Sequence, residues 1–179
     1  MPRIPYSDLK KGTFLIASPE IDKGILFRSV VLLCDHSPVG SFGMIINKPL
    51  DIDISGEMLS QQELASIEMR VRAGGPNQPN QILLLHSSEQ DPNSNLQICE
   101  GVYLGGDIDS IQEMTNTPKP PSILICLGYV SWNAGLLERE FLSGIWYLHP
   151  ASKKHVFETL PEKMWQTLLR EMGGKYEML

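Results

Sequence analysis

Cysteine is scarce in this chain of 179 residues: there are three, Cys34, Cys99 and Cys126, and no two of them form a C-x-x-C pair. An odd number leaves at least one thiol outside any intramolecular disulfide, so the sequence favours a reducing compartment over a secreted disulfide scaffold. Cys34 and Cys126 also lie within apolar runs, where thiols tend to be protonated and inert.

Long apolar runs are absent as well. Stretches such as 30–34 and 82–85 are far shorter than the roughly 18 residues that a membrane-spanning helix needs. Near the N-terminus, prolines and lysines interrupt the segment where a signal peptide would have its apolar core. The sequence therefore predicts a cytoplasmic protein without a membrane segment.

Positive charge is in deficit, with 15 Lys and Arg side chains against 21 Asp and Glu, a formal net charge of -6. Nonspecific nucleic-acid affinity comes from cations that displace the counterions of the phosphates, so this balance disfavours direct DNA binding. Small basic clusters are predicted to belong to solvated faces. They are Lys10 with Lys11, Arg70 with Arg72, and Lys153 with Lys154.

What the sequence does contain is an ordinary globular composition, 42% hydrophobic and 20% charged. A chain of this length buries about 70% of its unfolded surface, enough for one self-supporting domain over residues 1–179. Short runs rich in Ile, Leu and Val predict strands, several of them continuous enough to be covered on both faces. The predicted strands are 13–17, 29–35, 42–47, 69–73, 81–86, 96–104 and 123–130.

Helices are predicted between and after these strands, which makes the fold class α+β. Ser60 and Glu63 have the spacing of a capping box before a short helix near 61–67. Two further helices are expected near 107–114 and 134–143.

The clearest helix is the last one. Thr159 is its expected N-cap and Glu162 the capping-box partner, and Gly173 with Gly174 ends it. Apolar residues at helical spacing predict a single buried face. They are Met164, Trp165, Leu168, Leu169 and Met172.

Five sequence segments carry a family signal. Their order and spacing together are a more specific signal than any one segment alone. They are 12–19 (GTFLIASP), 27–31 (FRSVV), 35–49 with its DH pair and its GMIINKP end, 74–76 (GGP) followed by LH at 85–86, and 128–140 (GYVSWNAGLLERE) followed by Gly144 and Trp146. On these segments the chain resembles the YqgE/AlgH family, bacterial proteins of about this length, over nearly all of its residues.

The resemblance implies an α+β fold in which a mixed, partly barrel-like sheet is flanked by helices. Members are often labelled transcriptional regulators, and the resemblance brings no established catalytic residue or ligand. The family usually has Gln where this chain has Leu136. If Asn133 is the N-cap of the helix near 134–143, this position is N3, where Gln would reach back to the cap, so a structural capping role is expected.

Glycine-rich segments supply most of the candidate ligand-binding residues. The strand-to-helix passage at 128–135 presents backbone N–H groups that could hold an anion, or it is a tight turn on which aromatic residues pack. The Gly-Gly-Pro at 74–76 turns the chain or lets a ligand approach the backbone, and the turn is the favoured interpretation. The candidates are Asn47, Gly74, Gly75, Pro76, His86, Gly128, Tyr129, Trp132 and Gly135.

Histidines and carboxylates supply the alternative, an enzyme. His86 ends a predicted strand and is either a general base or a hydrogen-bonded structural residue. The Asp-His pair at 35–36 and Asn47 each follow an apolar strand, and they would converge if those strands were neighbours in a hairpin. Glu138 and Glu140 are expected to face solvent.

No H-E-x-x-H motif, cysteine pair or nucleotide-binding loop occurs, so no metal and no cofactor are predicted. The sequence favours a protein that binds an unknown small ligand or a protein partner, with any role in gene expression indirect. The alternative is a hydrolase or transferase that uses His86 or His36 in a Gly-rich pocket.

Overall fold

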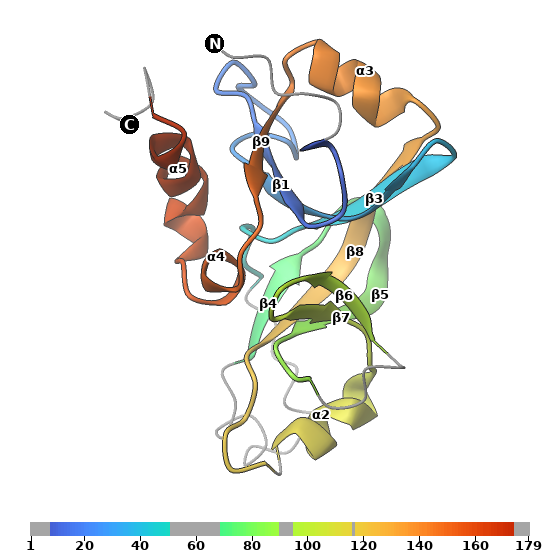
Figure 1. Ribbon diagram of the computed structural model, residues 1–179, viewed down its shortest axis with the longest axis vertical. Coiled ribbons are helices and arrows are strands. Elements are labelled where there is room, and N and C mark those ends of the chain that lie inside the picture. The colour runs from blue at the N-terminus through green and yellow to red at the C-terminus, as the bar shows by residue number, and fades with distance from the viewer. Residues whose placement is uncertain (1–7, 51–68, 90–94, 116, 174–179) are drawn as a thin grey trace.

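The computed structural model describes residues 8–50, 69–89, 95–115 and 117–173 (Figure 1). Within them, strands of one curled sheet make up most of the regular structure, and four helices pack against it. The strands are β1 Thr13–Ala17, β2 Val30–Ser37, β3 Gly40–Ile45, β4 Met69–Ala73, β5 Asn77–His86, β6 Leu96–Cys99, β7 Val102–Leu104, β8 Ile123–Asn133 and β9 Trp146–Pro150. The helices are α2 Ile108–Thr115, α3 Leu136–Leu142, α4 Lys153–Phe157 and α5 Pro161–Glu171.

The sheet is a mostly antiparallel half-barrel with the strand order β6-β7-β5-β8-β3-β2-β1-β9, and β4 pairs with β8 in parallel. The 11-residue β8 joins its two parts, because its first half pairs with β4 and β5 and its second half pairs with β3. The predicted α+β class and partly barrel-like, mixed sheet are confirmed.

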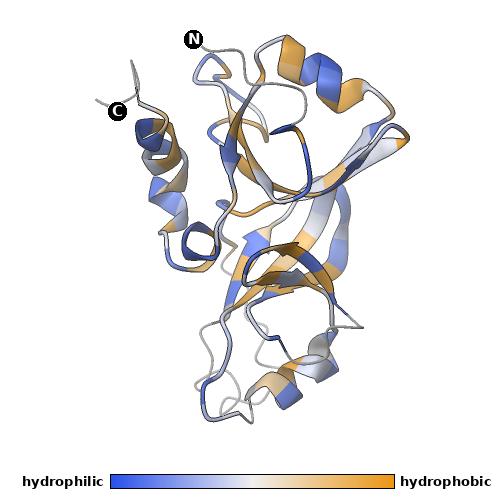
Figure 2. Cartoon of the chain, in the orientation of Figure 1, coloured by the Kyte–Doolittle hydropathy of each residue, from blue (hydrophilic) through white to orange (hydrophobic). Residues whose placement is uncertain are grey.

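Strands β1, β2 and β3 are buried on both faces, as their continuous apolar runs predict. In β1, Phe14 and Ile16 point into a core cluster with α5, whereas Leu15 and Ala17 point into a second cluster with Leu137 of α3. Figure 1 shows α4 and α5 beside β1 and β9, and α3 over another part of the sheet. A third cluster lies between α2 and strands β4, β5 and β8. Figure 2 shows the hydrophobic stretches concentrated in the strands.

The strand predictions at 13–17 and 69–73 agree with β1 and β4. The prediction of one strand over 96–104 is wrong, because Gly101 with φ of 79° turns the chain and divides the segment into antiparallel β6 and β7. Strand β9 and helix α4 were not predicted. Both are short, and each is buried by tertiary packing that local patterns do not show.

Helix α2 confirms the prediction near 107–114. The capping prediction for the helix near 134–143, which is α3, is wrong. Asn133 is the last residue of β8, and Gly135, with φ of 78°, is the N-cap of α3, so Leu136 is the first helical residue rather than N3. The predicted helix near 61–67 lies outside the described residues. In the part of the chain that the structure describes, no helix is both long and apolar enough to cross a membrane.

At the last helix, Leu160 and not Thr159 is the N-cap of α5, and Pro161 takes the first helical position. The fixed φ of proline and its missing N–H suit that position. Thr159 lies one residue earlier, where its Oγ1 is 2.7 Å from His155 Nδ1. The predicted apolar face is confirmed for Met164, Trp165, Leu168 and Leu169, all of which are buried.

Arg72 corrects the expectation that the basic clusters are solvated. Only 4% of this residue is exposed, and its Nε donates to the carbonyl of Ile46 at 2.9 Å. Burial lowers the pKa of the guanidinium. Arg72 therefore fastens β4 to the end of β3 and is not part of a charged surface.

Candidate functional site

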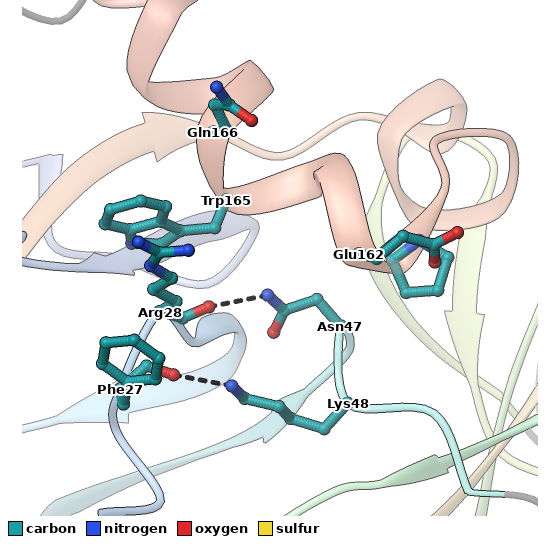
Figure 3. Close-up of a pocket in the computed structure, with 8 residues that line it drawn as sticks. Phe27, Arg28, Asn47, Lys48, Glu162, Trp165 and Gln166 are labelled. Atoms are coloured by element: carbon teal, nitrogen blue, oxygen red, sulfur yellow. Dashed lines mark hydrogen bonds between the residues drawn. The ribbon is translucent and has the colours of Figure 1, made fainter. Parts of the chain in front are cut away.

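A hollow of about 270 Å³ lies where the chain enters β2, where it leaves β3, and where α5 begins (Figure 3). Because β2 and β3 are antiparallel, the start of one strand and the end of the other meet at this edge. The lining residues are Phe27, Arg28, Asn47, Lys48, Pro161, Glu162, Trp165 and Gln166.

Arg28 has a left-handed backbone, with φ of 51°. This conformation costs a residue other than glycine about 1–2 kcal/mol. Turn hydrogen bonds on either side hold it: Phe27 N donates to Gly24 O at 3.1 Å, and Ser29 N donates to Leu26 O at 3.1 Å. Backbone strain of this kind is concentrated at functional sites.

Asn47 fixes the same turn from the end of β3. Its Oδ1 accepts from the N–H of Val30 at 2.8 Å, and its Nδ2 donates to the carbonyl of Arg28 at 2.8 Å. This candidate residue is therefore a buried clamp that holds Arg28 at the hollow. The predicted convergence of Asn47 with Asp35 and His36 is wrong, because the antiparallel register puts them at opposite ends of the hairpin.

The guanidinium of Arg28 lies between two aromatic rings. Its Cζ is 5.1 Å from the centre of the Phe27 ring and 5.2 Å from that of Trp165. The Trp165 indole is itself fixed, since its Nε1 donates to the carbonyl of Ala17 at 2.8 Å. The two rings cover the faces of the guanidinium and leave the N–H groups at its edge uncovered.

Lys48 brings a second cation to the hollow. Its Nζ donates to the carbonyl of Phe27 at 2.6 Å and lies 5.9 Å from the centre of the Phe27 ring. Partial burial, and secondarily the charge of Arg28, lower the pKa of this ammonium group. Bringing two cations together has a cost that a bound anion would remove.

These cations are not neutralised within the described part of the chain. Neither Arg28 nor Lys48 forms an ion pair within 4.0 Å with a carboxylate of the described residues. Glu162 lines the hollow, but Figure 3 shows it on the far side of Asn47 from Arg28, with its carboxylate turned away. The hollow thus presents unpaired positive charge on an acidic protein.

The glycine-rich segments predicted as ligand sites come together elsewhere. A Cβ at Gly74 would collide with the carbonyl oxygen of Gly128, and one at Gly75 would collide with the backbone of Tyr129. The glycines at 74–75 therefore allow the end of β4 to press against β8 at the point where the chain reverses direction between β4, which is parallel to β8, and β5, which is antiparallel to it. Pro76 is exposed beside them.

His86 is a fully buried, hydrogen-bonded residue. Its Nδ1 accepts from the N–H of Ser88 at 3.1 Å, which assigns the hydrogen to Nε2 and lets it donate to Oδ1 of Asn95 at 3.1 Å. The ring stacks on Tyr103 with centroids 5.9 Å apart. Burial lowers the pKa of His86, which favours the neutral imidazole.

Trp132, the aromatic candidate of the strand-to-helix passage, packs edge-on against Trp146 with ring centroids 6.2 Å apart. Both indole nitrogens donate to the same oxygen, Oε1 of Glu140, at 2.9 Å. Glu140 therefore points toward the sheet, which corrects the expectation that it faces solvent. Gly135 provides the turn that brings α3 back over these two strands.

Glu138 also turns inward. Its Oε1 is 3.0 Å from Nε2 of His36, and Nδ1 of the same ring is 2.6 Å from the hydroxyl of Ser41. A β-bulge between Leu33 and Asp35 shifts the register so that His36 is the cross-strand partner of Ser41. The hairpin end of β2 and β3 thus carries a connected Ser–His–Glu cluster.

The cysteines agree with the sequence prediction. Cys34 and Cys126 are fully buried, and burial raises the pKa of both thiols, that of Cys126 to about 12. Cys99 is half-buried, and its pKa is raised by burial as well. These thiols stay protonated near neutral pH.

Comparison with known proteins places the chain in a family. The model of the AlgH-like family, DUF179, matches residues 14–177. The chain belongs to this family. A UPF0301 protein of Chlamydia abortus is 48% identical over 179 residues, covering 100% of this chain and 95% of the relative. A UPF0301 protein of Chlorobium luteolum is 35% identical, covering 97% of this chain and 92% of the relative.

Two solved structures share the fold of this family member. The solution structure of the AlgH protein from Pseudomonas aeruginosa has a TM-score of 0.76 at 25% identity and covers 99% of this chain and 96% of its own. A crystal structure of a protein from Corynebacterium diphtheriae has a TM-score of 0.79 at 18% identity, with 99% and 93% covered. The resemblance read from the sequence is confirmed.

Of the residues that line the hollow, sequence reasoning identified only Asn47 as a candidate, and it missed the three that matter most here, Arg28, Lys48 and Trp165. Arg28 and Lys48 lie in segments that carry the family resemblance, directly before β2 and after β3. Antiparallel pairing of those two strands was enough to bring them together. Trp165 was assigned only to the buried face of the last helix, and nothing local shows that one edge of its ring borders a hollow.

Proposed function

We propose that this AlgH-like protein binds a small anionic ligand in the hollow between the 27–28 turn, Asn47 with Lys48, and α5. The observation that carries the proposal is Arg28, a strained residue whose guanidinium is held between two aromatic rings without a carboxylate partner among the described residues. A planar guanidinium fixed in this way presents parallel N–H donors that match a carboxylate or phosphate.

Size and surroundings support a compact ligand. The volume of about 270 Å³ suits an anionic group with a small organic part attached. The rings of Phe27 and Trp165 stack against the Arg28 guanidinium, and charge-assisted hydrogen bonds from such a cation are stronger than those between neutral groups. Gln166 lines the same hollow from α5 and would contact the uncharged part of the ligand.

Any effect on transcription would be indirect and would follow from ligand occupancy and a protein partner. The net charge of -6 opposes direct contact with DNA phosphates. The two cations of the hollow lie in a concave surface of small volume, which suits a small molecule better than a duplex backbone.

The test is titration calorimetry with sulfate, inorganic phosphate, pyrophosphate and citrate, supported by thermal-shift measurements. We expect at least one anion to bind and to raise the melting temperature, since a ligand that binds only the native state stabilises it. Arg28→Gln should weaken binding by tenfold or more, because it removes a charge-assisted bond worth about 1.5–3 kcal/mol.

Arg139→Gln is the matched control, because Arg139 is an exposed arginine on α3, away from the hollow. It removes the same charge from the protein and should leave the affinity unchanged. If both variants weaken binding equally, the effect is one of net charge and the assignment to the hollow is wrong.

A second candidate function is acyl transfer at Ser41. Nε2–H of His36 donates to Glu138, which leaves Nδ1 to accept the hydroxyl proton of Ser41 across a distance of 2.6 Å. The order of the ring nitrogens is the reverse of that in chymotrypsin-like enzymes, but the roles are the same. Oγ would attack an ester carbonyl, Nδ1 would take its proton and pass it to the departing alkoxide, and water would then release the acid.

A fluorophosphonate probe tests this candidate, because it reacts with activated serines. We expect an adduct on Ser41 that is lost in His36→Asn and kept in Ser131→Ala, whose hydroxyl lies in an exposed pair with Asn77. Intact protein without an adduct after long incubation would reject the enzyme hypothesis at this cluster.

A further inference from the structure

Lys48 lines the hollow as a half-buried amine. Its Nζ donates to the carbonyl oxygen of Phe27 at 2.6 Å, and Figure 3 shows the side chain directed toward that carbonyl. Among the residues that the structure describes, no carboxylate forms an ion pair with this amine. The amine is therefore positioned by an uncharged acceptor and not by an acid.

This setting favours loss of the proton from Lys48. Burial, and secondarily the charge of Arg28, lower the pKa of the amine. An ion pair with a carboxylate would oppose this shift, because it would stabilise the ammonium form. A neutral amine keeps two hydrogens, so it can still donate to the carbonyl of Phe27 while its electron pair is free. Desolvation and a neighbouring cation are the means by which proteins activate a lysine as a nucleophile.

Arg28 and Lys48 lie against the same aromatic ring. Cζ of Arg28 is 5.1 Å from the centre of the Phe27 ring, and Nζ of Lys48 is 5.9 Å from that centre. A guanidinium keeps its charge in proteins, whereas a half-buried amine can lose its proton and react with a carbonyl group. The two cations of the hollow are thus suited to different tasks, one to hold an anion and the other to attack it.

We propose that Lys48 forms an imine with a small 2-oxo acid whose carboxylate is held by Arg28; this inference rests on the proposed function. A 2-oxo acid has its reactive carbonyl carbon directly beside the carboxylate. Binding of the carboxylate at Arg28 therefore brings that carbon into the same hollow as the amine. The volume of about 270 Å³ admits a molecule of this size.

The reaction of Lys48 needs no redox partner. The electron pair of Nζ attacks the 2-oxo carbon, a C–N bond forms, and the carbonyl oxygen becomes a hydroxyl by taking one hydrogen of the amine through solvent. The electron pair of the nitrogen then forms the C=N double bond as the hydroxyl leaves, and the second hydrogen of the amine completes a water molecule. One neutral amine and one 2-oxo acid thus give one imine and one water.

Reductive trapping of the whole chain tests the imine. The protein is incubated with pyruvate and cyanoborohydride, which reduces an imine to a stable secondary amine, and peptide mapping by mass spectrometry locates the adducts. We expect Lys48 to be modified severalfold faster than Lys163, an exposed lysine of α5 that does not line the hollow. Lys48→Arg should lose the principal adduct, and the matched control Lys163→Arg should keep it.

Methyl pyruvate tests the role of the carboxylate, because the ester has the same 2-oxo carbon without the charge. The ratio of Lys48 to Lys163 modification corrects for the different reactivity of the two compounds. We expect this ratio to be severalfold higher with pyruvate than with the ester. Arg28→Gln should remove the difference, since the carboxylate then has no partner.

Calorimetry with sulfate on the same protein distinguishes failure of the imine from failure of the anion site. Sulfate binding without preferential modification of Lys48 would overturn the imine and leave the anion site in place. Equal preference for Lys48 with pyruvate and with its ester, without sulfate binding, would overturn the anion site and the 2-oxo acid together. Circular dichroism of each variant separates loss of the adduct from loss of the fold.

Discussion

The two ends of the β2–β3 hairpin differ in how their charged groups are satisfied. At the turn end, His36 has Ser41 on one ring nitrogen and Glu138 on the other. At the open end, Arg28 has aromatic rings on its faces and, within the described residues, no carboxylate within 4.0 Å. One pair of strands thus supports a closed polar cluster and an open cationic hollow.

This difference separates stability from binding. A polar group whose partners are all supplied by the fold contributes to stability, and removing a partner leaves a costly unsatisfied atom. A cation held in a strained turn without a partner gives the fold little and is suited to a ligand. The comparison predicts that substitutions under α3 lower stability and leave anion binding unchanged, whereas substitutions at the hollow change binding.

The largest expected effect is that of Trp132→Ala under α3. Trp132 is 5% exposed, packs against Trp146 and donates to Glu140, so its loss should lower the free energy of unfolding by about 3–5 kcal/mol. Urea unfolding measures this loss, and anion affinity per folded molecule should not change. Trp165→Ala is the matched variant at the hollow and should lose both stability and affinity.

Loss of affinity in Trp132→Ala under conditions where the protein is fully folded would break the comparison. It would show that the strand-to-helix passage at 128–135, and not the hollow, responds to the ligand.

Asn47→Ala is expected to have the next largest effect. It leaves the buried N–H of Val30 and the partly buried carbonyl of Arg28 without their partner, which costs about 1–3 kcal/mol, mostly from the buried N–H. It also releases the turn that holds Arg28, so anion binding should be lost. Chemical unfolding and calorimetry on the same sample measure both.

Asn77→Ala provides the control for Asn47, since the Nδ2 of Asn77 donates to Ser131 in an exposed pair. It should change stability by less than about 0.5 kcal/mol. Equal effects of the two substitutions would mean that Asn47 does not hold the site.

A smaller effect is expected for Glu138→Gln at the turn end. The pair with His36 is partly exposed, with 16% and 22% of the two side chains accessible, so the loss should be about 0.5–1 kcal/mol. Anion affinity should stay within twofold of the wild-type value. A tenfold change in affinity would connect the two ends of the hairpin and remove the distinction between them.

Much of the fold could be predicted from the sequence because β1, β2 and β3 are covered on both faces and therefore read as continuous apolar runs. The resemblance to the family, read from the five segments, also implied the α+β architecture. Strand β9 and the Leu160 cap of α5 could not be predicted, since the first is an edge strand of five residues and the second depends on where Pro161 enters the helix.

The candidate residues show the same limit. Asn47 was identified, but as a neighbour of His36, because which ends of two strands meet depends on the direction of pairing. The glycines at 74, 75 and 128 were identified by composition, which does not distinguish close backbone packing from space for a ligand. Arg28 was not predicted as a site residue, because neither its φ of 51° nor its stacking on Trp165 leaves a signal in the surrounding sequence.

The smallest expected effect concerns the titration of Lys48. Partial burial and the charge of Arg28 lower its pKa, so anion binding should weaken at high pH earlier than an ordinary lysine would allow. In Arg28→Gln the repulsive neighbour is gone, and the pKa of Lys48 should rise toward its usual value. NMR of the lysine side chains measures this shift, with the wild-type protein as the reference. An unchanged pKa for Lys48 in that variant would mean that the two cations do not share the hollow, and the proposed anion site would lose its second charge.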